Sequence, residues 1–301
     1  MPELPEVENL RRGLERVIVG QKITFAKVTK PKLVSGKGTL RVASSKKVKE
    51  FIKGLKGETF SHVERRAKNL IFRFKSGKVL LGHLKMSGQF AYVPKVSDRK
   101  KVVMGGHPIK ISESELPNKH SHIIFELEKG TLYYNDTRMF GYLLYYPSVE
   151  AFEAENHFKL IGPEPLEKDF TVEYFKNALA SKKSIIKSVL MGQEIVAGLG
   201  NIYVDESLFE AKIKPTRTAS SLSLPEIKLL HTAIIRIIRK AVELGGSSVA
   251  TYRLLDMTRG NYAREHKVYG KDGQKCVRCG KPLKKILIQT RTTIFCPNCQ
   301  K

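Results

Sequence analysis

Acidic residues are scarce in this chain of 301 residues. Asp and Glu total 29 against 54 Lys and Arg, which leaves a formal net charge of +25. A field of that sign attracts polyanions and speeds their capture. Nucleic acid is therefore the expected partner, and an anionic membrane surface is the weaker alternative. Composition alone also fits a ribosomal or other RNA-binding protein.

Long apolar runs are missing as well. No stretch approaches the roughly 18 apolar residues of a membrane-spanning helix. The start of the chain is acidic and lacks the apolar core of a signal peptide. We therefore expect no membrane association and an intracellular protein of the cytoplasm or nucleoid that is not secreted. Tryptophan is also absent, which excludes nothing.

Cysteine is confined to the last 26 residues, so no disulfide can join other parts of the chain. This argues for a reducing compartment. The four residues form two pairs, Cys276-x-x-Cys279 and Cys296-x-x-Cys299, with 16 residues between them. Such spacing is typical of one zinc ion in a closed, structural four-thiolate site. Metal binding would supply the folding free energy of so short a segment; a pair of redox dithiols is the alternative.

The first eight residues, Met-Pro-Glu-Leu-Pro-Glu-Val-Glu, contain a candidate nucleophile. The small Pro2 allows Met1 to be removed, after which Pro2 carries a free secondary amine. Such an amine can attack a sugar aldehyde carbon and form an iminium. The carboxyls of Glu3 and Glu6 can supply or remove the protons that this chemistry needs. If Met1 is retained, the Pro2 nitrogen is an inert amide, and the terminus then simply frays.

The first half of the chain is typical of an antiparallel β-sandwich. Runs that alternate apolar and polar residues between Gly-containing turns predict strands over 23–28, 69–74, 78–81, 123–127 and 131–134. A helix from Glu8 to Ile18 is expected before them. Residues 95–119 are polar and rich in Gly, Pro and Lys, so we expect a long surface loop there.

Helical spacing dominates beyond residues 160–165. Helices are predicted over 171–182, 185–191 and 202–211, and a Gly-rich double turn precedes the last of them. An apolar stripe at three/four spacing predicts another helix from about 227 to 244, ending at Gly245-Gly246. The sequence therefore predicts an α+β multi-domain protein: an antiparallel β-sandwich (1–160), a helical domain (161–270) and a four-cysteine zinc ribbon (271–301).

Taken together, these features resemble the formamidopyrimidine-DNA glycosylase/endonuclease VIII family, nearly from end to end. Six motifs occur in family order: MPELPEVE, RRAKNL (65–70), HLKMSG (83–88), DTRMFG (136–141), GLGNIYVDE (198–206) and CVRCG with RTTIFCPNC (276–299). The resemblance implies that the double turn belongs to a helix–two-turn–helix. It also implies a bifunctional glycosylase and abasic-site lyase that excises oxidised purines, such as 8-oxoguanine and formamidopyrimidines, from duplex DNA.

The resemblance also implies roles for single residues. Pro2 is similar to the nucleophile that attacks the deoxyribose C1′, and Glu3 to the acid that assists ring opening. Lys68 is similar to a lysine that contacts phosphate and serves β-elimination, and Arg291 to an arginine that supports δ-elimination. The further family positions that contact DNA are His120, Arg138, Lys183 and Asn201.

A glycosylase must extrude the damaged nucleotide, so something has to fill the vacated stack. Apolar wedges from the minor groove do this in other proteins. By resemblance, Met86, Arg138 and Phe140 form that set, with Arg138 hydrogen-bonded to the orphaned base. Without the motifs, ordinary core packing would be the preferred interpretation of Met86 and Phe140.

Several expectations stay open at this point. The partner is damaged double-stranded DNA, the protein is expected to be a monomer, and one structural zinc ion is expected, with no redox or nucleotide cofactor. An endonuclease VIII-like activity on oxidised pyrimidines is the nearest alternative, and a non-catalytic zinc-ribbon sensor of DNA damage is another. The PELPE start favours the purine branch, as does the segment 247–269, which closes over the extruded base in purine-specific relatives.

The sequence departs from the family pattern at three places. Lys85 stands where many relatives have Gly, and Met139 stands where a basic residue is common. Residues 95–119 are longer than expected between the flanking motifs. These departures bear on lesion preference and affinity, because none of them touches Pro2, Glu3 or the cysteines.

Overall fold

The computed structural model describes residues 1–37, 41–95, 103–106, 116–247 and 260–301. They form two compact units: a first unit of residues 1–157 with 245–260, and a second unit of residues 158–244 with 261–301. The three-domain boundaries expected from the sequence stay a prediction. Among the described residues, no helix combines the length and apolarity that crossing a membrane requires.

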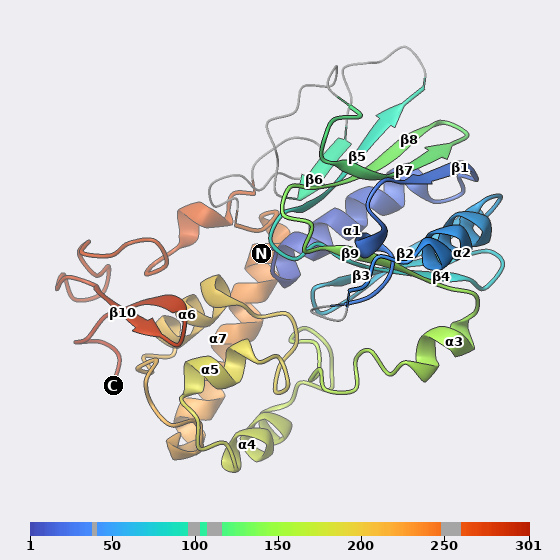
Figure 1. The fold of residues 1–301 in the computed structure, drawn as a ribbon. Helices are drawn as coiled ribbons and strands as arrows, with labels where there is room; N and C mark the ends of the chain where they lie inside the picture. Colours follow the sequence, from blue (N-terminus) through green and yellow to red (C-terminus); the bar gives the residue numbers. More distant parts are fainter. Residues whose placement is uncertain (38–40, 96–102, 107–115, 248–259) are drawn as a thin grey trace. The chain divides into compact units, whose positions relative to one another are not determined.

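The first unit is the predicted antiparallel sandwich (Figure 1). A five-stranded sheet has the order β1-β7-β8-β5-β6, and a four-stranded sheet has the order β2-β3-β4-β9. The strands are β1 (Ile23–Val28), β2 (Phe60–Arg66), β3 (Asn69–Phe74), β4 (Val79–His83), β5 (Gly88–Pro94), β6 (Val103–Gly106), β7 (Ser121–Leu127), β8 (Gly130–Asp136) and β9 (Tyr142–Tyr146).

Helix α1 (Leu4–Ile18) lies between the two sheets (Figure 1). Its residues Val7, Leu10 and Leu14 are buried in one apolar cluster with side chains of both sheets. Helix α2 (Ser45–Leu55), which the sequence analysis did not predict, adds Phe51 and Leu55 to the same cluster. The short elements η1 (Pro31–Leu33) and α3 (Val149–Ala154) complete the unit.

Two predictions for this unit were wrong. Helix α1 begins at Leu4 rather than Glu8, because Glu3 and Glu6 form a reciprocal capping box and Pro5 suits the first turn. The region 95–119 is not all loop, because β6 pairs antiparallel with β5. Two glycines in four residues gave no strand signal, and the neighbouring edge of β5 supplies the pairing instead. Residues 96–102 and 107–115 lie outside the described residues.

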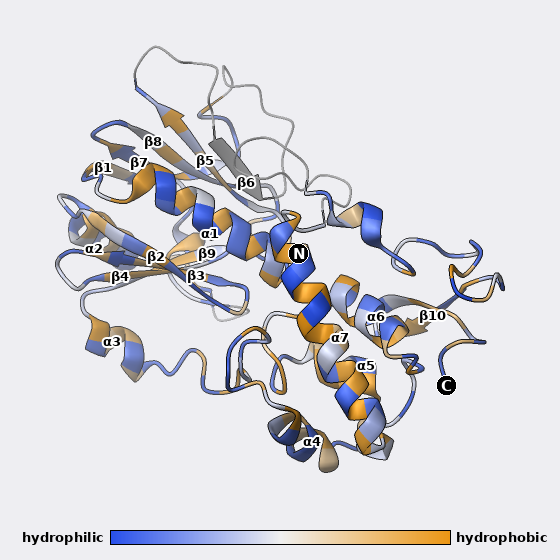
Figure 2. Ribbon diagram, turned by 180° about the vertical axis from the view of Figure 1, so that it is seen from behind, coloured by the Kyte–Doolittle hydropathy of each residue, from blue (hydrophilic) through white to orange (hydrophobic). Residues whose placement is uncertain are grey.

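The second unit contains the predicted helices. They are α4 (Val172–Ala180), α5 (Ile186–Met191), α6 (Asn201–Glu210) and α7 (Leu224–Glu243), with the short helices η4 (Ala219–Ser221) and η5 (Tyr262–Glu265). Figure 2 shows hydrophobic and hydrophilic residues alternating along α7, and its predicted stripe, including Leu230, Ile234 and Ile238, is buried. The helix ends where predicted, because Gly245 and Gly246 both have positive φ.

The ribbon hairpin belongs to the second unit as well. Strands β10 (Lys284–Ile288) and β11 (Arg291–Phe295) pair antiparallel. A small apolar cluster joins Val268, Leu283 and Ile294 to Phe209 of α6, together with the cysteines. The metal-site segment therefore shares its core with the last turn of α6.

Candidate active site

The N-terminal residues are ordered and buried at the start of α1. Pro2 is buried, and Glu3 is only 4% exposed. The Glu3 N–H donates to Glu6 Oε2 at 2.9 Å, as one half of the capping box. The positive end of the helix dipole favours ionised carboxyls at this position. The predicted nucleophile Pro2 and the carboxyl of Glu3 are thus adjacent and buried, in a setting unlike a frayed terminus.

Glu6 ties this terminus to the segment that follows α7. Its Oε1 accepts the Ser247 N–H at 2.7 Å. A Cβ added to Gly246 would lie 2.7 Å from the same oxygen, so this position requires glycine for close approach as well as for its φ of +81°. The predicted base-closing region, 247–269, begins here, but residues 248–259 of it lie outside the described residues.

Lys68 lies in the tight turn between β2 and β3 and is only 3% exposed, which is unusual for lysine. Ala67 takes a positive φ of 53° in that turn. Arg65 holds the turn by donating to the Ala67 carbonyl at 3.1 Å, and it pairs with Glu8 of α1 at 3.1 Å. This ion pair joins the Lys68 hairpin to α1, the helix that Glu3 caps.

The Glu8 carboxyl is ionised at neutral pH. Burial raises its pKa, but hydrogen bonds from Arg11 and the charges of Arg11 and Arg65 outweigh that effect, so the net pKa is lowered. The Glu8–Arg65 ion pair is therefore formed at neutral pH. Its side chains are each 14% exposed, so solvent screens the pair only in part.

Strand register brings three of the motifs and the loop of His120 to one end of the sandwich. The relevant cross-strand pairs are Leu70 with Gly82, His83 with Tyr142, Gly88 with Asp136, and Ser121 with Asn135. Each pair lies at or next to the end of its two strands. The first two pairs belong to the four-stranded sheet and the last two to the five-stranded sheet. The loops that carry Lys68, Met86, Arg138 and His120 therefore emerge from the same end.

His83 is a site residue to which the sequence analysis assigned no role. Its Nδ1 accepts the Lys85 N–H at 2.9 Å, which leaves the proton on Nε2. Burial lowers the pKa of His83 to about 3, and the charges of Lys85, Lys68 and the N-terminal amino group add to the effect. His83 is therefore a neutral hydrogen-bond donor beside several cations. Its place in the motif HLKMSG was the only sequence signal.

The predicted wedge residues are accessible at the surface. Phe140 is 49% exposed, Arg138 is exposed and Met86 is partly exposed; Met139, between Arg138 and Phe140, is 42% exposed. The Arg138 guanidinium lies over the Phe140 ring, 4.8 Å from its centroid. Core packing therefore does not account for Phe140, which stands with Arg138 on the surface of the first unit.

Asp136 fixes the loop that presents these side chains. One carboxylate oxygen accepts the Arg138 N–H at 3.1 Å, and the other accepts the Gly141 N–H at 2.7 Å. Ser87, from the loop that contains Met86, also donates to Asp136. Asp136 is fully buried. The two loops of the predicted wedge set therefore share one anchor.

His120 lies beside the same anchor. Its carbonyl accepts the Asp136 N–H at 3.1 Å, and its own N–H donates to Asn118 Oδ1 at 2.8 Å. The side chain is partly exposed. The backbone is thus fixed, and the imidazole is accessible to a ligand.

Backbone conformation explains one of the departures noted above. Lys85 has a φ of +50° and Met139 a φ of +54°, both in the left-handed region. Glycine adopts that region without strain, whereas for other residues this conformation costs roughly 1–2 kcal/mol of conformational free energy. A preference for Gly at position 85 therefore follows from the turn itself rather than from contact with a ligand.

In the second unit, Asn201 is the first residue of α6, and its Nδ2 donates to the Thr292 carbonyl at 2.9 Å. Arg291 opens β11 and is exposed, as is Lys183 between α4 and α5. The N-terminal end of α6 and the tip of the ribbon hairpin are therefore held together. Backbone N–H groups at a helix start also suit an anion such as phosphate.

A buried ion pair supports the same junction. Lys187 Nζ lies 2.6 Å from Asp205 Oδ1, and both side chains are fully buried. Lys187 also donates to the Thr292 carbonyl at 3.3 Å, and Asp205 accepts the Ile294 N–H at 3.2 Å. Burial raises the pKa of Asp205, and Lys187 acts against that rise. Helices α5 and α6 thus fix the strand that carries Arg291.

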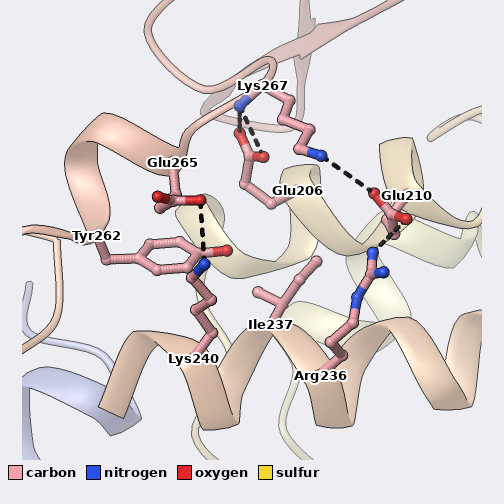
Figure 3. A pocket seen from close by; sticks show the side chains of 8 residues that line it. All are labelled: Glu206, Glu210, Arg236, Ile237, Lys240, Tyr262, Glu265 and Lys267. Atoms are coloured by element: carbon pink, nitrogen blue, oxygen red, sulfur yellow. Dashed lines mark hydrogen bonds and ion pairs between the residues drawn. The ribbon is translucent and has the colours of Figure 1, made fainter. Parts of the chain in front are cut away.

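A polar pocket of about 220 Å³ lies between α6, α7 and η5 (Figure 3). Glu210 pairs with Arg236 and Lys267, and Lys240 pairs with Glu265. Glu206 accepts three backbone N–H groups, those of residues 267–269. Because these charges satisfy one another, the pocket is best explained as the clamp that holds residues 262–269 on the two helices.

The four cysteines converge as predicted. Their sulfurs all lie within 4.8 Å of one another, with Cys276–Cys299 at 3.9 Å and Cys279–Cys296 at 3.5 Å. A tetrahedral zinc ion with Zn–S bonds of about 2.3 Å places its sulfurs roughly 3.8 Å apart. The donor set thus fits one structural zinc ion, and no thiolate position is left open for a substrate.

Three family models match successive parts of the chain. They are the formamidopyrimidine-DNA glycosylase N-terminal domain (residues 1–143), the formamidopyrimidine-DNA glycosylase H2TH domain (161–253) and the zinc finger found in FPG and IleRS (273–301). Together they cover most of the sequence in the order that the motifs predicted.

Proteins that match over their whole length belong to the same family as these models. The formamidopyrimidine-DNA glycosylase of Streptococcus mutans is 41% identical, and that of Lactococcus lactis is 39% identical, each covering 100% of both chains. A mutant of the Lactococcus lactis protein in complex with Fapy-dG DNA has a TM-score of 0.84 at 39% identity, covering 100% of both chains. The complex with abasic-site DNA also has a TM-score of 0.84 at 39% identity, covering 99% of each chain.

Proposed function

This chain belongs to the formamidopyrimidine-DNA glycosylase family, and from that premise we propose how its own residues perform base excision. It is a DNA glycosylase and abasic-site lyase of base-excision repair, which removes the ribosomal and non-catalytic alternatives. Damaged duplex DNA is its partner. The finer assignments below, including oxidised purines as the preferred lesions, are the proposal.

The observation that carries the proposal is the buried Pro2–Glu3 start of α1, in the same unit as the end of the sandwich where three motif loops and the His120 loop converge. Once Met1 is removed, the Pro2 nitrogen is a free secondary amine directly before the first turn of α1, and its unprotonated form is the nucleophile.

The proposed chemistry begins at C1′ of the extruded nucleotide. The Pro2 nitrogen forms a bond to C1′, and the C1′–N bond to the base breaks, so that the base leaves with the electron pair. The Pro2 nitrogen loses its proton to the departing base. Its freed lone pair then forms the Pro2–C1′ iminium as the C1′–O4′ bond opens and Glu3 donates a proton to O4′. The iminium acidifies the C2′ proton. Its removal expels the 3′ phosphate as β-elimination.

We assign the later steps to the two cationic residues. Lys68, in its buried hairpin beside the neutral donor His83, holds a phosphate while β-elimination proceeds. Arg291 binds the phosphate that leaves from C5′ in δ-elimination. Water then hydrolyses the imine and restores the Pro2 amine. Lys183, Asn201 and His120 contribute phosphate contacts, which supply most of the affinity.

The wedge belongs to the same proposal. Met86, Arg138 and Phe140 fill the stack that the extruded nucleotide vacates, and Arg138 hydrogen-bonds to the orphaned base. Their exposure on loops with a common anchor supports this. We further infer that the protein acts as a monomer. We also infer that it acts at the nucleoid, because its proposed substrate is chromosomal DNA.

Borohydride trapping on a duplex with 8-oxoguanine tests the nucleophile. Wild-type protein with its mature N-terminus verified by mass spectrometry should form a reducible crosslink. The form that retains Met1 should form none, because its Pro2 nitrogen is an amide. Pro2→Gly should trap much less, and Glu3→Gln should slow the release of products. Equal trapping by Pro2→Gly and wild type would show that the assignment is wrong.

Lesion preference needs a separate test, because one solved complex of the Lactococcus lactis protein contains an oxidised pyrimidine. We expect faster single-turnover excision of 8-oxoguanine and formamidopyrimidine than of thymine glycol, each in the same duplex. A reversed order would assign the chain to the endonuclease VIII-like alternative. The choice of lesion leaves the trapping chemistry of Pro2 unchanged, so the two tests are independent.

A further inference from the structure

Arg41 reaches across the first unit to the loop that carries the proposed wedge. Its Nη1 donates to the Met139 carbonyl at 2.6 Å, and its Nη2 donates to the Phe140 carbonyl at 2.6 Å and also to the Gly141 carbonyl. Its guanidinium also lies 5.9 Å from the centre of the Tyr142 ring. One side chain thus binds three consecutive carbonyls of an exposed loop.

These bonds complete the restraint of the loop. Asp136 already accepts the N–H groups of Arg138 and Gly141, and Arg41 takes the carbonyls of the same stretch. Met139 is held in a left-handed conformation that a free loop would relax. The planar fork of a guanidinium can serve several acceptors in fixed directions, whereas an ammonium cannot.

Arg41 also joins a second segment to the loop. Residues 30–33, Arg41 and Ala43 line a cavity of about 580 Å³ together with residues 138–140. Lys30 and Lys32 are among the residues that line this cavity. The wedge loop is therefore braced from the segment that precedes α2, as well as from Asp136 in its own strand.

We propose that Arg41 is a positioning residue for base extrusion: it keeps residues 138–141 in the one geometry in which Arg138 and Phe140 can enter the stack and contact the orphaned base. The inference rests on the proposed wedge role of those two residues. Loop stiffness matters here because a wedge must unstack a base step to enter the duplex, and unstacking opposes insertion. A loop free to deform would yield instead of opening the duplex.

A direct contact between Arg41 and a DNA phosphate is the competing role. Both Nη atoms are already bonded to the loop carbonyls, which favours the positioning role. The two roles also differ in salt dependence. Loss of one phosphate contact reduces the slope of log K against log salt by about 0.9, whereas loss of a brace leaves that slope unchanged.

The test compares full-length variants in single-turnover excision of 8-oxoguanine placed opposite cytosine or adenine. The variants are Arg41→Met, Arg41→Lys, Phe140→Ala and the double variant Arg41→Met/Phe140→Ala, with Arg16→Met as the matched control. Arg16 is an exposed arginine on α1, so its variant loses the same charge. A 2-aminopurine opposite the lesion reports stack opening, and thermal unfolding shows that each variant is folded.

We expect Arg41→Met to slow excision by roughly ten- to a hundredfold, the size of effect that misplaced groups produce. The 2-aminopurine signal should fall, discrimination between cytosine and adenine should weaken, and the salt slope should stay unchanged. Arg41→Lys should not restore the rate. In the Phe140→Ala background, Arg41→Met should have no further effect, because both changes disable one wedge.

Three results would overturn the inference. A rate for Arg41→Met equal to that of Arg16→Met excludes a positioning role. Additive losses in the double variant, with a reduced salt slope, identify a phosphate contact instead. If Phe140→Ala leaves excision unchanged, the wedge role in the proposed function fails, and any effect of Arg41→Met then has another origin.

Discussion

Gly141, the last residue of the wedge loop, should tolerate no side chain. A Cβ at this position would lie 1.7 Å from the Tyr134 hydroxyl oxygen, 2.9 Å from the His83 carbonyl oxygen and 3.0 Å from a carboxylate oxygen of Asp136. Overpacking of a filled core destabilises by about 1–3 kcal/mol or more. We expect Gly141→Ala to lower the free energy of unfolding by an amount at or above the upper end of that range, because one of the close contacts is with a backbone atom.

The Tyr134 hydroxyl offers a way to separate the contributions. It is fully buried and has no hydrogen-bond partner among the residues that the structure describes. A buried polar group without a partner destabilises by about 1–3 kcal/mol. Tyr134→Phe alone should therefore leave stability unchanged or raise it, although most Tyr→Phe changes in a core lose a hydrogen bond.

The double variant Gly141→Ala/Tyr134→Phe should recover part of the loss. Its coupling energy should be favourable and lie between about 1 and 3 kcal/mol, the range for residues in contact. Recovery should be incomplete, because the His83 carbonyl still lies within 2.9 Å of the added carbon. Excision should recover less than stability does, since the wedge loop remains displaced.

Urea unfolding of the four proteins supplies the free energies, and single-turnover excision supplies the functional readout. Gly192→Ala is the matched control, because a Cβ there meets nothing closer than 3.5 Å. It should be neutral or slightly stabilising. Additivity of the two changes, with no coupling, would refute the reasoning that the hydroxyl fills the space beside Gly141.

Three further outcomes are expected. The pKa of His83 falls to about 3 on folding, so the folded protein takes up a proton on His83 less readily than the unfolded chain. The free energy of unfolding should therefore drop as pH falls from about 6.5 toward 3, by up to about 1.4 kcal/mol per pH unit. His83→Gln should flatten this part of the stability–pH curve. Lys187→Met should destabilise by about 3–5 kcal/mol by leaving Asp205 buried and unpaired, and Lys187→Met/Asp205→Leu should recover most of that loss in the same urea measurement. Removal of zinc by a chelator, or Cys276→Ser, should abolish amide-exchange protection in β10 and β11 and weaken DNA binding, while the strands of the first unit stay protected; protection of the hairpin without metal would contradict this.

Local patterns predicted most elements of the fold. The strands 23–28 and 69–74 were placed residue for residue, and the end of α7 at Gly245 was correct. Elements whose stability comes from distant partners were missed. Strand β6 forms because β5 offers a free edge, and α2 has few apolar residues beyond Phe51, Ile52 and Leu55. Neither shows a strong period within its own sequence.

The site divides in the same way. Motifs singled out Pro2, Glu3 and Lys68 one at a time, but nothing in the chain says that residues about 65 positions apart share a unit and a connecting ion pair. Arg41 carried no sequence signal, because its partners are carbonyls about 100 residues away, and His83 was marked only by its place in a motif. Roles for these residues follow only from register and contact.

The sequence by itself determined the chemistry that is available: a small second residue that can expose a secondary amine, a carboxyl beside it, two knuckles of thiolates at zinc spacing and an excess of cationic side chains. These depend on residue type and short spacing, which are local properties. The tertiary structure decided which groups meet. Antiparallel pairing brings three motif loops and the His120 loop to one end of the sandwich. Burial makes Lys68 and His83 unlike their exposed counterparts, and Arg41 and Asp136 together fix the loop of residues 138–141. Burial and long-range contact are properties of the packed chain, so no window of sequence contains them.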